Sequence, residues 1–218
     1  MIDVVSDVVC PWCYVGKRRL ESALSQLHAD DPALETRVNW HPFQLNAELP
    51  ARGADRKRYL EAKFGGAARA GEMYERVRAA GEDVGIAFDF DRIAVQPNTL
   101  AAHRLIGWAQ HEHDAGDLVE RLFAGYFIEG RDIGDHAVLA QIAGEAGLDP
   151  AEAKAWLDDG RGGDAIAAMD VRARELGVSG VPFFIFDGRV AVSGAHESNV
   201  LLQAIAQARE ARDAQAHD

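Results

Sequence analysis

The chain has 218 residues, of which 48% are hydrophobic and 27% are charged, so it can bury a full core as one large domain or two small ones. Its formal net charge of −12 argues against nucleic acid as a partner, because phosphate binding requires clustered lysine and arginine. No apolar run approaches the roughly 20 residues that cross a bilayer, and no basic segment with a small-residue cleavage site opens the chain. We therefore expect a cytoplasmic protein with no membrane partner.

The amino-terminal segment is expected to form a strand, a helix and a second strand. Residues 2–9 are a short β-branched apolar run that predicts a buried strand. Pro11 suits the first position of a helix, and leucines at helical spacing follow it. A second short strand, with alternating apolar residues, is expected to stop at Pro42.

Residues 55–177 show helical periodicity, which predicts a block of helices. The clearest helix start is Asp149 followed by Pro150, an N-cap residue and a proline at the first helical position. A later apolar stripe is expected to face the core and to end at Gly177, a C-cap residue. The stripe comprises Ile166, Met169, Ala173 and Leu176.

Residues 181–194 predict two strands joined at Asp187–Gly188, a dipeptide favoured in hairpin turns, before a last helix. Strands from the two ends of the chain are most simply joined in one mixed sheet, so we expect an α/β fold. The predicted domains are a discontinuous one, residues 1–48 and 178–218, and a helical insertion, residues 49–177.

Both cysteines of the chain, Cys10 and Cys13, lie at the predicted start of the first helix, in the sequence CPWC. At this spacing they can cycle between dithiol and disulfide. A helix amino terminus favours a thiolate at the first cysteine, so we interpret Cys10 as the nucleophile and Cys13 as the resolving thiol. Pro11 and Trp12 stiffen the turn between them. The helix start at Pro11 should leave Cys10 near the surface, and the basic residues 17–19 could add positive potential.

A closely spaced cysteine pair can also bind zinc, attach a c-type haem or serve a purely structural role. Structural zinc needs about four ligands and the chain has no second pair, so we expect no metal site. A c-type haem needs histidine directly after the second cysteine, where this chain has Tyr14. Purely structural burial of the two cysteines stays open.

Pro182 has two possible roles. It is either an ordinary proline at the start of a strand, or it follows a cis peptide bond after Val181.

Taken together, these features resemble the DsbA-like branch of the thioredoxin superfamily, and most closely its cytosolic FrnE-like proteins, named for an association with polyketide biosynthesis. The resemblance covers nearly the whole chain and is carried by "SDVVCPWCYVGKRRLE", "HPFQLN", "NTLAAHRLIGWA", "YFIEGRDIGDHAVLAQIAGEAGLD" and "ELGVSGVPFFIFDGRVAVSGA".

This resemblance implies a thioredoxin fold interrupted by a helical domain, thiol–disulfide exchange at Cys10 and Cys13, and a cis bond before Pro182 beside them. In the superfamily the backbone of the residue before that proline pairs with substrate, which makes Val181 an expected contact. The implied substrates are thiols or disulfides of proteins, peptides or small molecules. No cofactor is expected beyond the redox-active disulfide, with glutathione as a candidate co-substrate.

The chain departs from the family pattern at three places. Many relatives carry a buried acidic residue six positions before the nucleophile, where this chain has Val4. We interpret the flanking Asp3 and Asp7 as strand-end or cap residues. His196, at an expected substrate-binding edge, stands where we would expect glutamine. The chain also lacks the second cysteine pair of some relatives, which excludes a relay to another internal disulfide.

Two other functions stay open. Kappa-class glutathione transferases and 2-hydroxychromene-2-carboxylate isomerases share the helical insert, so Asn98 and His103 could line a small-molecule cleft. Their simpler roles are a helix cap and a buried helix residue. Those enzymes generally have serine at the nucleophile position, so the two cysteines favour disulfide exchange. A peptide-binding chaperone module is the non-enzymatic alternative, because a groove beside Val181 would bind peptides either way.

Overall fold

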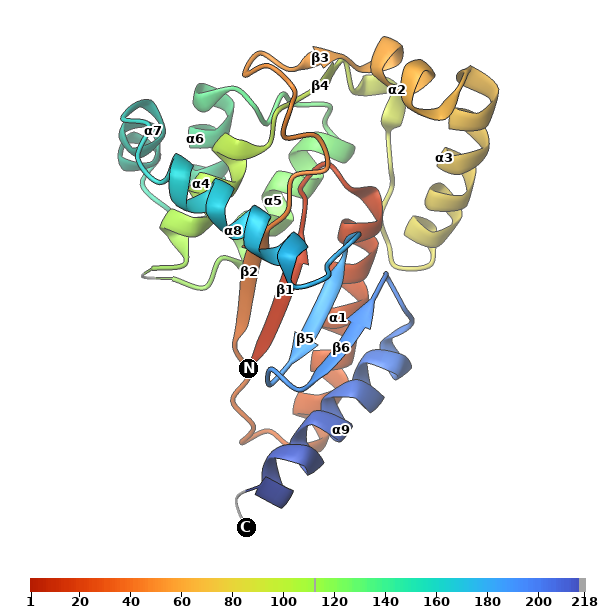
Figure 1. Cartoon of the computed structure of the whole chain (residues 1–218), viewed down its shortest axis with the longest axis vertical. Coiled ribbons are helices and arrows are strands. Elements are labelled where there is room, and N and C mark those ends of the chain that lie inside the picture. Colours follow the sequence, from red (N-terminus) through yellow and green to blue (C-terminus); the bar gives the residue numbers. More distant parts are fainter. Residues whose placement is uncertain (112, 216–218) are drawn as a thin grey trace.

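The computed structural model describes residues 1–111 and 113–215, which are built around a four-stranded sheet (Figure 1). The spatial order of the strands is β2-β1-β5-β6; β1 is parallel to β2 and antiparallel to β5, and β6 is antiparallel to β5. The predicted mixed sheet from the two ends of the chain is thereby confirmed. Its strands are β1 (Ile2–Ser6), β2 (Val38–Pro42), β5 (Phe183–Phe186) and β6 (Val190–Ser193).

Two long helices cover one face of this sheet. Helix α1 (Pro11–Asp30) follows β1 after a short loop, and α9 (Ser198–Gln215) packs on α1 and β6. On this face the side chains of Phe184 and Phe186 are 0% and 1% exposed, as expected for alternate residues of a half-buried strand. The β-α-β and β-β-α halves form a thioredoxin fold, as the resemblance implied.

The chain between β2 and β5 forms a layer of helices beyond the carboxyl end of β1 (Figure 1). The side chain of Asp149 accepts the N–H groups of Ala151 and Glu152 at 2.7 and 3.0 Å, which confirms it as an N-cap. The helices are α2 (Arg56–Phe64), α3 (Ala67–Glu82), α4 (Leu100–Ala109), α5 (Gly116–Phe127), α6 (His136–Glu145), α7 (Pro150–Asp158) and α8 (Gly163–Glu175), with a short 3-10 helix at Phe90–Arg92.

The four strands of the main sheet thus come from residues 1–48 and 178–218, and helices α2 to α8 come from residues 49–177. The exact boundaries of two separate domains stay a prediction. In the part of the chain that the structure describes, no helix is both long and apolar enough to cross a membrane.

Two features differ from the sequence-based expectation. A two-stranded ribbon, β3 (Ala54–Asp55) and β4 (Val95–Gln96), lies within the helical layer. Two-residue strands carry no periodic pattern, which is why they were not predicted. The apolar stripe of α8 is only partly buried: Met169 is 41% and Leu176 is 67% exposed. Helix α8 packs on α4 and β2 and borders an open apolar groove over the second face of the sheet.

Candidate active site

Cys10 is the N-cap residue of α1. Its extended backbone, with φ −95° and ψ 112°, lets the helix begin at Pro11. The side chain of Cys10 makes no capping hydrogen bond within α1, so its sulfur remains available for other partners. The sulfur of Cys10 therefore lies at the amino end of α1, the end of a helix that favours negative charge.

A segment far along the chain, Val181–Pro182, lies beside the sulfur of Cys10. The peptide bond between them is cis. The Cys10 thiol donates a hydrogen bond to the carbonyl oxygen of Val181, with 3.6 Å between Sγ and oxygen. Pro182 is buried against the first turns of α1, close to Gly16. The nucleophile and the substrate contact implied by the resemblance are therefore adjacent.

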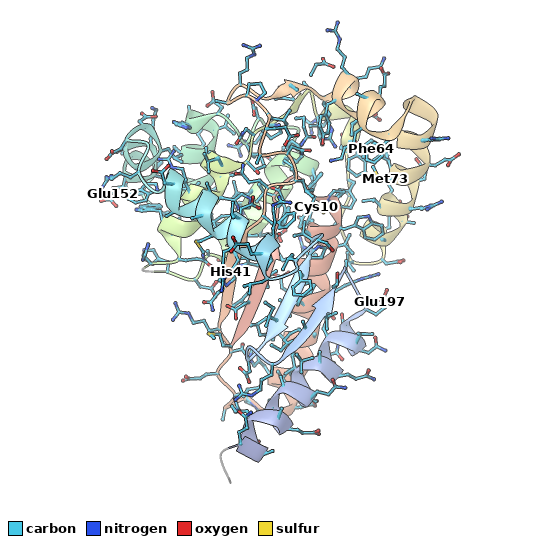
Figure 2. All side chains as sticks on the ribbon, viewed as in Figure 1. Cys10, His41, Phe64, Met73, Glu152 and Glu197 are labelled. Carbon is cyan, nitrogen blue, oxygen red and sulfur yellow. The ribbon has the colours of Figure 1, made fainter. Side chains whose placement is uncertain are left out.

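A pocket of about 160 Å³ opens beside Cys10. Cys10 is only 6% exposed and is therefore more buried than predicted. Residues of α2 and α3 line the other side of this pocket. Figure 2 shows Cys10 at the amino end of α1, with Phe64 and Met73 on the neighbouring α2 and α3. Pro11 and Trp12 also line the pocket, whose surface is mostly apolar. The helical insertion thus provides one side of the site.

Two cations line the same pocket. Arg56 is 5% exposed, and Lys63 is exposed on α2. Among the described residues, no carboxylate forms an ion pair with either one. Their hydrogen-bond partners are neutral: Gln96, Tyr74 and Tyr126 for Arg56, and Asn46 and Tyr59 for Lys63. The pocket therefore carries two positive charges that no carboxylate of the described residues pairs with.

Cys13 lies deeper than Cys10 and is 2% exposed. Burial raises the pKa of the Cys13 thiol well above its usual range, and the neighbouring Cys10 raises it further. The nearby side chain of Ser6 and backbone of Asp7 act in the opposite direction and lower this pKa. The two thiols are therefore chemically distinct: Cys10 faces a pocket, whereas Cys13 faces the protein interior.

Asp7 is a strand-end residue, as expected, but it does not cap α1. Its side chain is 0% exposed and lies 3.3 Å from Nε2 of His103, itself 4% exposed. The second carboxylate oxygen of Asp7 accepts the backbone N–H of Leu45 at 2.8 Å. A buried acid–imidazole pair therefore lies one residue beyond β1, where the sequence suggested only a strand-end or cap residue.

The basic triplet at residues 17–19 does not supply free positive potential to the site. The Lys17 and Arg18 side chains bind Glu120 at 2.8 and 2.6 Å, and Arg19 binds Glu197 at 2.5 Å. Each cation is neutralised by a carboxylate, so the expectation that the triplet adds positive potential at Cys10 is wrong. Arg56 and Lys63, which no local motif indicates, supply this charge instead.

The other predicted contacts lie outside the pocket that contains Cys10. Asn98 donates to the carbonyl of Leu49 at 2.7 Å and accepts the N–H of Leu100 at 3.0 Å. His103 is buried with Asp7, and the exposed ring of His196 bonds to the Ser193 carbonyl at 3.0 Å. A role for these three residues in substrate binding stays a prediction. No cluster of three potential metal ligands occurs in residues 1–111 and 113–215.

Comparison with known proteins gives three informative similarities. The chain is 27% identical over 209 residues to the uncharacterized protein YwbO of Bacillus subtilis, and 94% of each chain is covered. It is 32% identical to the probable DsbA oxidoreductase SCO1869 from Streptomyces coelicolor, with a TM-score of 0.85 and coverage of 96% of this chain and 89% of that one. The cytosolic disulfide reductase DsbM from Pseudomonas aeruginosa, solved with GSH, has a TM-score of 0.62 at 18% identity, with coverage of 100% and 99%.

The last of these similarities concerns the fold alone. The model of the DSBA-like thioredoxin domain matches residues 1–206, which include the CPWC segment, the helical insertion and the strand that follows Pro182. With its sheet order and its cysteine pair at the start of α1, the chain thus belongs to the DSBA-like thioredoxin domain family.

Proposed function

We propose that this protein is a thiol–disulfide oxidoreductase that exchanges disulfides through Cys10 and Cys13. The observation that carries the proposal is the asymmetry of the two thiols: Cys10 lies at a helix amino terminus beside a pocket, and Cys13 is buried one helical turn behind it. An attacking thiol must be reachable by substrate, whereas a resolving thiol needs to reach only its neighbour. Family membership supports the same class of chemistry.

The proposed exchange has two steps. First, the Cys10 thiolate attacks one sulfur of a substrate disulfide, which forms a mixed disulfide and releases the other substrate sulfur as a thiolate that takes up a proton. Second, the Cys13 thiolate attacks Sγ of Cys10, forms the Cys10–Cys13 disulfide and releases the remaining substrate sulfur. The substrate gains the two electrons that the cysteines lose. The reverse sequence oxidises a substrate dithiol.

Val181 is suited to hold the substrate during this exchange. Its carbonyl oxygen accepts the Cys10 thiol proton in the reduced protein. Because Cys10 has no proton in the mixed disulfide, the same oxygen becomes available to a substrate backbone N–H. A substrate peptide would therefore gain a hydrogen bond in the step that bonds it covalently.

Catalysed reduction of insulin by glutathione tests this proposal. The wild-type protein should accelerate the reaction, Cys10→Ala should abolish turnover, and Cys13→Ser should accumulate a mixed disulfide with the substrate. Ser25→Ala, on the exposed surface of α1, is the matched control and should behave as wild type. A protein that suppresses aggregation of unfolded chains equally well with and without Cys10, and shows no turnover, would be a chaperone module instead.

The uncompensated charge of Arg56 and Lys63 favours an anionic thiol, such as glutathione, as the co-substrate that closes the cycle. A carboxylate in the pocket would supply the partner that neither cation has within the described chain. Lys63→Gln should raise KM for glutathione several-fold and leave turnover with the uncharged dithiothreitol unchanged. Lys57→Gln, on the exposed side of the same helix, is the control; an equal loss with both reductants would contradict charge recognition.

The proposal also includes the branch of the family and the cellular location of the protein. We place the protein in the FrnE-like branch and in the cytoplasm, where glutathione maintains free thiols. The isomerase and transferase alternative requires turnover of a small molecule without net thiol oxidation. Measuring 2-hydroxychromene-2-carboxylate isomerisation with Cys13→Ser distinguishes it, because that chemistry needs no second thiol.

A further inference from the structure

The proposed exchange requires deprotonation of Cys13, and it does not by itself supply the group that accepts this proton. Cys13 must lose a proton before it can attack Cys10, yet the residue is only 2% exposed. Burial disfavours the charged thiolate. The position six residues before the nucleophile is the apolar Val4, which can accept no proton. A proton acceptor for Cys13 must therefore come from elsewhere in the fold.

Ser6 lies near Cys13 and lines a small, mostly apolar cavity that also contains His103 and His41. Ser6 is 5% exposed, and it lies close enough to Cys13 to lower the pKa of that thiol. Among the described residues, the buried Ser6 hydroxyl has no hydrogen-bond partner, so it can bond to a water molecule. The cavity has a volume of about 40 Å³, which exceeds the roughly 15 Å³ that one water molecule requires.

His103 lines the same cavity from α4 and is 4% exposed. Its Nε2 lies 3.3 Å from the fully buried carboxylate of Asp7. An imidazole held by a carboxylate is a proton acceptor suited to neutral pH. The backbone N–H of Cys10 bonds to the Asp7 carbonyl at 3.0 Å, and the Asp7 backbone lowers the pKa of the Cys13 thiol, so this acid–imidazole pair and the resolving thiol share one small region of the interior.

The remaining groups around the cavity leave few other acceptors. Helices α5 and α8 contribute the apolar side chains of Val119, Ile166 and Met169. From β2 comes His41, which is 36% exposed and bound to Asp3 at 2.9 Å. His41 therefore lies between the cavity and solvent, where a proton can leave the interior. The titratable groups that face His103 here are Asp7, His41 and, through Ser6, Cys13.

We propose that the Asp7–His103 pair accepts the proton of Cys13, which reaches it through the Ser6 hydroxyl and water in the adjoining cavity. This inference rests on the proposed function. The Cys13 proton passes to His103, and the Cys13 thiolate then attacks Sγ of Cys10. The sulfur–sulfur bond of the mixed disulfide breaks, and the substrate thiolate leaves with the electron pair. His103 later returns the proton to solvent by way of His41.

Reaction of the reduced protein with Ellman's reagent distinguishes the reaction of Cys10 from that of Cys13 as two kinetic phases. Attack by Cys10 releases one thionitrobenzoate, and resolution by Cys13 releases a second. His103→Gln should leave the first phase within about twofold of wild type and slow the second by at least about tenfold at pH 7, with a changed pH profile. Ser6→Ala should slow the second phase in the same way.

The matched control is His136→Gln, which removes a second histidine–aspartate pair at 2.9 Å, between His136 and Asp158. It should leave both phases unchanged. An unaltered second phase in His103→Gln, or in Ser6→Ala should the first variant fail to fold, would overturn the inference. So would an equal slowing of both phases, because that indicates a structural role. If the wild-type protein released no second thionitrobenzoate, the proposed function itself would be wrong.

Discussion

The backbone of α1 passes Pro182 so closely at Gly16 that a Cβ built there would lie 2.9 Å from Cγ of the proline ring and 3.1 Å from the Phe184 ring. No flexible side-chain end can move aside, because the first of these atoms belongs to a closed ring. Glycine at this position therefore sets the distance between the helix that carries both cysteines and the segment that approaches Cys10 from the other end of the chain.

Gly16→Ala should destabilise the fold by about 1–3 kcal/mol, because the added methyl group overpacks this contact. Urea unfolding monitored by circular dichroism measures the change. Gly71→Ala, in the middle of α3 with no atom near its Cβ position, is the control and should stabilise the protein by about 0.5–1 kcal/mol. Equal effects of the two substitutions would show that the contact with Pro182 is unimportant.

In the reduced protein, iodoacetamide should modify Cys10 faster than Cys13 at mildly acidic pH. Cys10 lines the pocket, and burial raises the pKa of Cys13, so that less of it is thiolate. Mass spectrometry of the separated peptides gives both rates. The urea-denatured protein is the control, in which the two rates should converge; a faster Cys13 in the folded protein would reverse the assignment of nucleophile and resolving thiol.

Glu120→Gln should destabilise the protein by about 3 kcal/mol at pH 7, because it removes one carboxylate partner of the buried Lys17. Glu21→Gln changes the other, more exposed partner of Lys17 and should cost less than about 1 kcal/mol. Denaturant unfolding of both variants measures the difference. Equal losses would mean that Glu120 has no special role.

The effect of Glu120 should also depend on pH. Burial alone would raise the pKa of this carboxyl, but the charges of Lys17 and Arg18, with hydrogen bonds from Lys17 and Tyr14, outweigh it and lower the pKa. A carboxyl with a lowered folded-state pKa contributes stability above the ordinary value of about 4.3, and this is lost as pH falls through the lower folded value. The difference in unfolding free energy between wild type and Glu120→Gln should therefore narrow as pH falls from about 5 to about 3. A gap independent of pH would contradict this reasoning.

Arg104→Ala should destabilise the protein by at least about 2 kcal/mol, because a buried guanidinium that bonds to three carbonyl groups is removed. Those carbonyls, of Trp156, Leu157 and Arg161, lie at the carboxyl end of α7 and just beyond it. Thermal unfolding measures the loss. Arg121→Ala, an exposed arginine on α5, is the control and should change stability by less than about 0.5 kcal/mol.

The sequence allowed prediction of the elements whose signals are local. Pro11 marks the start of α1, and Asp187–Gly188 forms the hairpin turn with φ values of 49° and 65°. The ribbon of β3 and β4 was not predictable, since its two halves pair across about forty residues with no periodic pattern. The exposure of Met169 and Leu176 depends on how far α8 extends over the sheet, which its own periodicity does not specify.

The candidate site divides in the same way. Short motifs suggested Cys10, Cys13 and Pro182 as candidate site residues, because the residues next to them in the sequence indicate their roles. The pairing of Asp7 with His103 joins positions 96 residues apart, and the pocket charge comes from a helix in the insertion. Tertiary packing alone decides such contacts, so the sequence indicated their residue types but not their partners.

The sheet order has a consequence for synthesis of the protein on the ribosome. Strand β1 ends at Ser6, but its neighbour β5 begins only at Phe183 and is therefore translated much later. Until then, one edge of β1 has no partner, and Cys10 lacks the Val181 carbonyl that accepts its thiol proton. The nascent chain therefore carries an uncovered Cys10 thiol and an open strand edge together, a combination that exposes it to premature disulfides and to aggregation until β5 has been translated.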